Sequence, residues 1–148
     1  MYHARYAEGV RIWLYYVGKP RDAQANALAE QYIRRASRYA RCQMSEVHPA
    51  RSRWWDKHAS AWRVLLDPGG ERLDSAGFAR LVGQAEMQGR DLVFVVGGAD
   101  GLPEAWRGYA DRLLSLSPLT LPHELARVVL AEQIYRALAF LRGHPYPR

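Results

Sequence analysis

The sequence contains little from which metal-centred or covalent chemistry could be built. Cys42 is its single cysteine, which excludes an internal disulfide and any metal site made of several thiolates. None of the five histidines has the H-x-x-x-H spacing of a zinc-binding helix, and no serine stands in a G-x-S-x-G turn. We therefore expect neither a resident metal nor a covalent nucleophile.

Long apolar runs are also missing. Charged residues interrupt every apolar stretch before the roughly 18–20 residues that a membrane span needs, and residues 1–9 lack the apolar core of a secretion signal. The 148 residues are nevertheless 49% apolar and include five Trp, nine Tyr and three Phe, which is typical of a folded chain. We expect one cytoplasmic domain over residues 1–148, without a membrane partner.

Lysine is scarce in a chain that is nevertheless basic. Twenty-one basic residues face fifteen acidic ones, for a net charge of +6, and only Lys19 and Lys57 are lysines. The planar guanidinium of arginine suits phosphate and base stacking better than an ammonium does, so the charge favours an anionic partner such as RNA. A codon bias toward arginine explains the same composition, and the charge alone leaves both interpretations open.

The rest of the pattern alternates short apolar runs with amphipathic segments. Strands are predicted at 10–17, 44–48, 62–67, 92–96 and 113–117, and a loop at 49–57. Helices are predicted at 22–39, 74–88, 103–112 and 122–143, from capping residues, Pro and Gly at their ends and apolar positions at helical spacing. This alternation predicts an α/β domain with a largely parallel sheet.

The last predicted helix is more apolar than contact with one sheet requires. Its apolar residues cover well over half of the helix circumference and are Leu125, Val128, Val129, Leu130, Ile134, Tyr135, Leu138 and Leu141. A second apolar face on a small protein predicts a dimer interface.

Two loops stand where open α/β sheets bind ligands. The string GGADG at 97–101 follows a buried strand directly, and its glycines permit a close backbone approach; it lacks the spacing of a dinucleotide or phosphate-binding motif. The string SLSPLTLPH at 115–123 predicts a rigid loop with inward-facing leucines, able to pack against an adenine ring. A tight turn and a connector into the last helix are the alternative interpretations.

A third segment mixes cations with tryptophans. Arg51, Arg53, Trp54, Trp55 and Lys57 interleave charge with stacking surfaces, as binders of single-stranded nucleic acid do. Partly buried packing of the tryptophans is the alternative, and it is the more common use of such a pair.

From residue 92 onward the sequence resembles a known family. LVFVVGGADG, LSLSPLTLPHELARVVLAEQIYRA and the closing HPYPR closely resemble the ribosomal large-subunit methyltransferase H family. The resemblance weakens before residue 92, where VGK at 17–19 and LLDPGG at 65–70 also fit. It implies a SPOUT-type parallel sheet flanked by helices, with a C-terminal deep trefoil knot, and a homodimer that uses S-adenosyl-L-methionine (AdoMet) to methylate N3 of a pseudouridine in 23S rRNA of the ribosome.

The resemblance also implies roles for individual residues. The cofactor would lie against Leu65, Leu66, Gly69, Gly97, Gly98, Gly101, Leu116, Ser117, Pro118, Leu119, Thr120 and Leu121. The catalytic residues would be His123, Arg136 and Tyr146, and the RNA contacts Arg127, His144 and Arg148. His123 and His144 are the conceivable bases for a direct in-line transfer from the cofactor to N3. A purely structural role for His123 is the alternative.

Three departures from the family pattern motivate alternative functions. The tail ends PYPR where the family has a His before its last basic residue, the region between residues 48 and 62 is shorter, and residues 1–9 precede the usual start as an extension. The alternatives are a degenerate SPOUT-fold protein that binds RNA or assists ribosome assembly, and a methyltransferase with a different RNA target.

Overall fold

A five-stranded parallel sheet organises the molecule. The computed structural model describes residues 10–146. Its strands are β1 (Arg11–Val17), β2 (Arg41–Val47), β3 (Trp62–Arg72), β4 (Leu92–Val96) and β5 (Arg112–Ser115), in the spatial order β2-β1-β4-β3-β5. Every pair of neighbouring strands is parallel, which confirms the predicted α/β class. Because all strands run the same way, their carboxyl ends meet at one edge.

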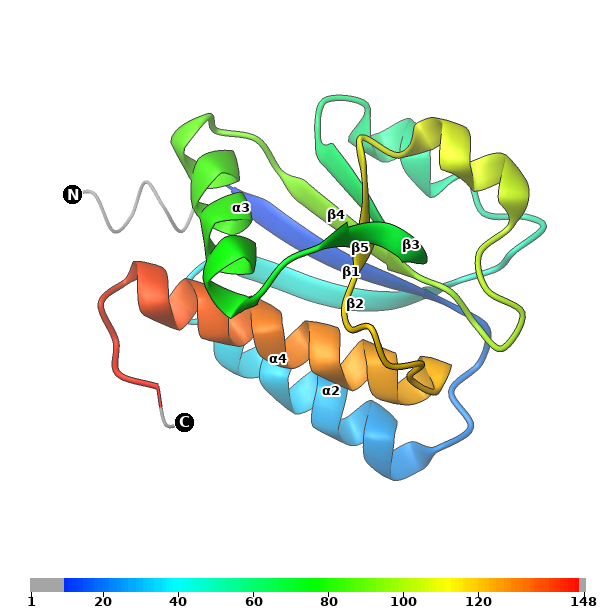
Figure 1. Ribbon diagram of the computed structural model, residues 1–148, viewed down its shortest axis with the longest axis horizontal. Coiled ribbons are helices and arrows are strands. Elements are labelled where there is room, and N and C mark those ends of the chain that lie inside the picture. The colour runs from blue at the N-terminus through cyan, green and yellow to red at the C-terminus, as the bar shows by residue number, and fades with distance from the viewer. Residues whose placement is uncertain (1–9, 147–148) are drawn as a thin grey trace.

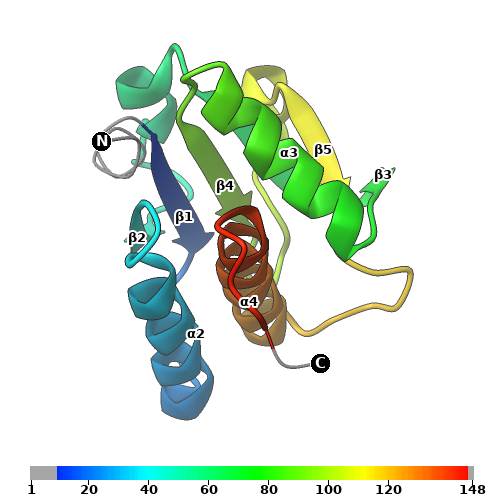
Figure 2. The same cartoon turned by 90° about the vertical axis from the view of Figure 1, so that its left-hand side faces the viewer.

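The two faces of the sheet are covered differently. Three α-helices, α2 (Ala23–Ala36), α3 (Ser75–Met87) and α4 (His123–Leu141), cover one face (Figures 1 and 2). Their apolar sides bury the alternate strand residues that point toward them, including Ile12, Leu14 and Phe94. The opposite face is covered by two short 3-10 helices, η1 (Trp54–His58) and η2 (Glu104–Tyr109), which pack on Tyr15 and Val95.

The helix ends follow local signals in the sequence. The Asp22 side chain accepts hydrogen bonds of 3.0 Å from the N–H groups of Gln24 and Ala25, so it caps α2. Asp74 caps α3 by accepting from the N–H of Gly77 at 2.8 Å. Gly143 has a φ of 71° just after α4, the conformation that terminates helices. These ends are where the sequence predicts them within a few residues.

Two predicted strand boundaries are wrong. β2 begins at Arg41 rather than at residue 44, because this edge strand alternates exposed and half-buried residues and has no continuous apolar run. β3 continues to Arg72 through the Pro-Gly-Gly that was expected to end it. Leu66 and Glu71 both pair with Leu114, so the four residues between them leave the ladder and re-enter it.

Gly70 makes that excursion possible. A Cβ atom at this position would lie 2.6 Å from the backbone of Leu113 and Leu114. The excursion therefore presses closely on β5, and only a glycine permits it. The sequence pattern of Pro-Gly-Gly predicts a turn that ends the strand. In the structure, Glu71 and Arg72 pair with β5 after the excursion, and this pairing extends β3.

The loop predicted at 49–57 is irregular up to residue 53 and then forms the 3-10 helix η1, and the helix predicted at 103–112 is the shorter 3-10 helix η2. Their tryptophans are packed: Trp54 and Trp106 are each only 3% exposed, with ring centroids 5.9 Å apart. Trp55 stacks on Tyr109 with a centroid distance of 4.1 Å. The packing interpretation of the tryptophan pair is therefore confirmed, because these rings are the second core of the protein.

The outer side of α4 remains apolar. Leu130, Ile134 and Leu138 are completely buried against the sheet, while Leu125 is 50% and Phe140 is 69% exposed. Within residues 10–146 no helix is long and apolar enough to cross a membrane. The same part of the chain contains no group of His, Cys, Asp and Glu placed to hold a metal ion.

Candidate active site

Three loops enclose a hollow of about 260 Å³ at the carboxyl edge of the sheet. They follow β4, follow β5 and leave the ladder within β3. Ten of the twelve residues predicted to hold a cofactor line this hollow: Leu66, Gly97, Gly98, Gly101, Leu116, Ser117, Pro118, Leu119, Thr120 and Leu121. Segments far apart in the sequence thus converge as the parallel topology requires.

Leu65 and Gly69 do not line the hollow. Leu65 is fully buried in the core beneath η1 and η2, because successive strand residues point to opposite faces of the sheet. Gly69 donates its N–H to the carboxylate of Asp67 at 2.9 Å, and Asp67 and Pro68 form the wall from this loop. Other described residues that line the hollow were not among those predicted to hold the cofactor, and they include Val96, Leu102, Leu114, Ser115 and Ala126.

The glycine turn after β4 is packed too closely for any side chain. A Cβ on Gly97 would lie 2.6 Å from the backbone of Gly101, and one on Gly98 would lie 2.9 Å from the carbonyl oxygen of Val17. Gly101 has a φ of 77° and donates its N–H to the Gly98 carbonyl at 3.0 Å. The segment is therefore a tight turn that also presents bare backbone to the hollow.

The loop after β5 is held by its own hydroxyl groups. Ser115 Oγ donates to the carbonyl of Ser117 at 3.1 Å, and Ser117 Oγ accepts from the N–H of Leu119 at 2.9 Å. The loop is thus fixed as predicted, but the expectation that its leucines all face inward is wrong for Leu119, which is 75% exposed at the rim.

The electrostatic character of the hollow is distinctive. Among the described residues that line it there is no lysine or arginine, and Asp67 is the one carboxylate. Asp67 is hydrogen-bonded to the guanidinium of Arg107, which also forms an ion pair of 3.2 Å with Glu104. Most of the lining residues are therefore apolar or glycine, and the polar side chains among them are Asp67, Ser115, Ser117, Thr120 and His123.

The other predicted catalytic residues lie at the opposite end of α4. Tyr146 donates its hydroxyl to Glu132 at 2.7 Å, and the Arg136 guanidinium lies 2.7 Å from the same carboxylate and 4.4 Å from the Tyr146 ring centroid. Burial and this hydrogen bond raise the pKa of Tyr146, so it stays a phenol. At 1.5 Å per residue, Arg136 lies about 20 Å along α4 from His123.

The residues predicted to contact RNA also lie away from the hollow. His144 is exposed near Tyr39, with ring centroids 5.6 Å apart, at the same end of α4 as Tyr146. Arg148 lies outside the described residues. Within one protomer, then, the hollow gathers His123 and the cofactor residues, whereas Arg136, Tyr146 and His144 gather elsewhere.

Arg127 cannot contact RNA from its position, so that prediction is wrong. Its side chain is 1% exposed, with the guanidinium 3.7 Å from the Tyr16 ring centroid and 3.3 Å from the Asn26 side-chain oxygen. Burial lowers the pKa of Arg127. The spacing of residues 127, 131, 134 and 138 already places Arg127 on the buried stripe of α4, a signal that its charge obscures.

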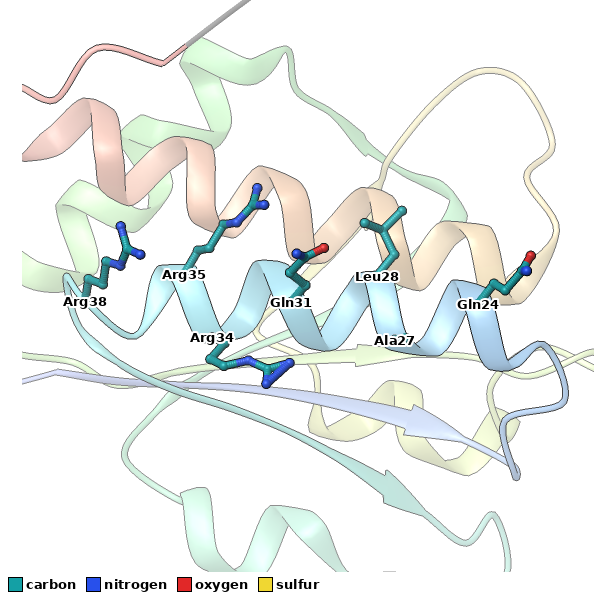
Figure 3. A pocket seen from close by; sticks show the side chains of 7 residues that line it. All are labelled: Gln24, Ala27, Leu28, Gln31, Arg34, Arg35 and Arg38. Atoms are coloured by element: carbon teal, nitrogen blue, oxygen red, sulfur yellow. The ribbon is translucent and has the colours of Figure 1, made fainter.

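A broad basic surface follows α2, away from the three loops. Figure 3 shows its side chains spread along the helix, and Arg34, Arg35 and Arg38 are all exposed. Among the described residues none of the three forms an ion pair. This surface is positively charged but open, and it holds none of the loop residues that line the hollow.

Comparison with known proteins shows the family of this chain. Residues 10–147 match the family described as "Predicted SPOUT methyltransferase". A protein of Solibacter usitatus named ribosomal RNA large subunit methyltransferase H is 55% identical over 139 residues, which cover 94% of this chain and all of the relative. A Thermus thermophilus protein of the same name is 43% identical, covering 94% of this chain and 99% of its own length.

Solved structures share the fold at low sequence identity. A probable methyltransferase from Bordetella pertussis superposes with a TM-score of 0.61 at 14% identity, covering 93% of this chain and 98% of that one. An AdoMet-bound rRNA methyltransferase from Sinorhizobium meliloti has a TM-score of 0.54 at 12% identity and covers 88% of this chain and 57% of that one. The chain belongs to the ribosomal large-subunit methyltransferase H family of SPOUT methyltransferases.

Proposed function

We propose that the protein transfers a methyl group from AdoMet to ribosomal RNA of the large subunit. The observation that carries this proposal is the hollow formed by three loops at the carboxyl edge of the sheet, in a chain whose relatives of 43–55% identity are named rRNA large-subunit methyltransferases. A ribosomal RNA substrate would place the enzyme in the cytoplasm, where the ribosomes are.

The residues of the hollow suit AdoMet. Apolar walls such as Leu66 and Leu116 suit the adenine ring, and the fixed loop at 116–121 offers backbone N–H and C=O groups to the ring edge. Gly97 and Gly98 allow backbone to approach the ligand closely. The absence of lysine and arginine among the lining residues is compatible with a cationic sulfonium. When bound there, AdoMet would supply an electrophilic methyl group.

The proposed acceptor is N3 of a pseudouridine in 23S rRNA. The protein must hold this atom in line with the methyl group and accept its proton, tasks that need neither a metal nor a covalent nucleophile. His123 lines the hollow and is the described residue best placed to accept the proton. His144, the other conceivable base, lies at the far end of α4.

The working unit is proposed to be a homodimer. Leu125 and Phe140 leave an apolar surface on α4 that burial against a second copy would cover. A two-fold axis across antiparallel α4 helices would bring the end that carries Arg136, Tyr146 and His144 to the hollow of the partner. Arg148, which lies outside the described residues, is proposed as a further contact to RNA.

A deep trefoil knot is the proposed path of the C-terminal third of the chain. The close passage of Gly70 over the Leu113–Leu114 backbone supports it, because this excursion from β3 wraps over the strand that leads into the loop at 116–121. When the protein is unfolded by pulling on its two ends, a tightened knot should make the extended chain shorter than its full contour length. An unknotted chain would reach its full contour length.

The function is tested with ribosomes from a strain that lacks the modification. Purified protein and radiolabelled AdoMet should place one methyl group per ribosome, which mass spectrometry of RNA fragments should locate on N3 of a 23S pseudouridine. Label on another nucleotide would identify a different RNA target. No label, with AdoMet binding intact by calorimetry, would contradict the proposal and favour an RNA-binding or assembly role.

A further inference from the structure

A second hollow, of about 390 Å³, adjoins the first. It is lined by the loop that follows β1, by the far side of the glycine turn and by His123. Gly98, Gly101, Leu102 and His123 line both hollows. The two spaces therefore meet at the glycine turn, and a ligand in one would lie beside a ligand in the other.

The second hollow differs from the first in charge. Its lining includes the exposed cations Lys19 and Arg21 and the exposed carboxylate Asp100. Among the described residues neither cation forms an ion pair, whereas Arg107 beside the first hollow is paired with both Asp67 and Glu104. An apolar hollow without lysine or arginine thus opens into one with two unpaired cations, which suits a neutral or cationic ligand beside an anionic one.

The backbone that carries the two cations is fixed. Gly18 has a φ of 89°, which turns the chain sharply after β1, and the Val17 carbonyl packs against Gly98. The Glu124 carboxylate accepts hydrogen bonds from the N–H groups of Arg21 and Asp22 at 2.9 and 3.1 Å. These hydrogen bonds lower the pKa of Glu124, so its carboxylate is ionised at neutral pH and continues to accept them. They connect the loop after β1 to Glu124, the residue that follows His123.

We propose that the second hollow receives the target nucleotide, with Lys19 and Arg21 as the groups that hold its phosphate and stabilise its base as the N3 proton leaves. This proposal rests on the proposed methyl transfer and names the residues that serve it on the substrate side. A nucleotide in RNA carries one anionic phosphate, and its base becomes a second anion on deprotonation. Two exposed cations match two negative groups, with Asp100 opposing them in part.

The reaction balances without further reagents. The N3–H bond breaks, and the proton passes to His123 or to water. The electron pair left on N3 forms a bond to the methyl carbon, while the pair of the carbon–sulfur bond stays on sulfur. Lys19 and Arg21 favour the deprotonated base by electrostatic attraction, so removing either charge should require a higher pH for the same rate.

The test compares variants that remove a charge from the second hollow with variants that remove a charge elsewhere on the surface. Lys19→Gln and Arg21→Gln are measured against Lys57→Gln, which changes the one other lysine, and Arg80→Gln on the exposed side of α3. Single-turnover methylation of unmodified ribosomes is followed across pH at saturating ribosome and AdoMet. We expect the Lys19→Gln rate at neutral pH to fall about tenfold or more, with its pH profile displaced upward. Lys19→Arg should recover most of the rate.

AdoMet affinity by calorimetry should be unchanged in these variants, because neither cation lines the first hollow. A saturating rate equal to wild type at every pH for both variants would overturn the proposal, as would a change in ribosome affinity alone. Equal losses in the Lys57→Gln and Arg80→Gln controls would overturn it too. Failure of the wild-type protein to methylate ribosomes is a separate result, which would contradict the proposed function itself.

Discussion

The two ends of α4 have different surroundings. At its first turn, His123 borders the hollow that three loops of the same chain enclose. At its last turns, Arg136 and Tyr146 gather around Glu132, away from any wall of that hollow. Under the proposed function, this difference implies that one chain supplies the walls of the cofactor site, whereas the contacts to the reacting base come from a second copy.

Filling the glycine turn should have the largest effect at the first end. Gly97→Val places side-chain atoms where even a Cβ would lie 2.6 Å from the Gly101 backbone. We expect AdoMet affinity to fall at least about 100-fold, because the turn must move and the bare backbone is covered. Calorimetry measures the loss, with Gly108→Ala as the matched control, since its Cβ would meet nothing within 4 Å. Unchanged AdoMet affinity would show that the glycine turn is not part of the cofactor site.

The buried side of α4 should affect stability rather than RNA binding. Arg127→Ala removes a buried side chain and its stacking on Tyr16, and we expect it to lower the free energy of unfolding by about 2–3 kcal/mol. Urea denaturation measures this change, with the exposed Arg38→Ala as the control within about 0.5 kcal/mol. A weaker ribosome affinity at unchanged stability would instead return Arg127 to the RNA interface.

Variants at the far end of α4 should separate catalysis from cofactor binding. Arg136→Ala removes the cation that pairs with Glu132 and covers the Tyr146 ring. We expect the methylation rate to fall about tenfold while AdoMet affinity stays within twofold of wild type. Ribosome methylation and calorimetry on the same preparation give both numbers. A loss of AdoMet affinity would place this end of the helix within the cofactor site of its own protomer.

The smallest effect is expected at Cys42, which packs near the far end of α4. Burial, with a further contribution from Glu86, raises the pKa of its thiol to about 12. Because the thiol stays protonated below that pH, the folded protein at pH 8 should react with a thiol reagent far more slowly than the urea-unfolded protein. Rapid modification of the folded chain would show that this end of the molecule opens, and the contacts of Tyr146 would lose their fixed position.

Much of the site end could be predicted from the sequence, because its signals are local. The buried run at 92–96, the glycines after it and the proline-bounded loop at 115–123 each mark a carboxyl end of the sheet. Leu65 was misplaced because a family match gives a range, while the alternation of β3 decides which residue faces the hollow. β3 itself outlasts its Pro-Gly-Gly because pairing with β5 overrides the local turn signal.

Three other positions resisted prediction from local sequence signals. Nothing in the sequence near Tyr146 indicates that Glu132 accepts its hydroxyl, and the charge of Arg127 suggested a surface position that its helical spacing contradicts. The tryptophans at 54 and 55 likewise resemble a stacking surface until η2 supplies Trp106 and Tyr109 as their partners. Packing between distant segments decides the positions of Tyr146 and of the tryptophans, whereas at Arg127 a local signal was present and its charge obscured it.

Combining two impaired variants in one dimer tests the division between the ends of α4 most directly. Gly97→Val disables the hollow and Arg136→Ala weakens the opposite end, so differently tagged copies are co-expressed and the mixed dimer is isolated through both tags. In that dimer one hollow and one far end remain intact on different chains. We predict that it methylates ribosomes at about half the wild-type rate, from one working site of two. A mixed dimer no more active than its parents would show that each site is built within one chain.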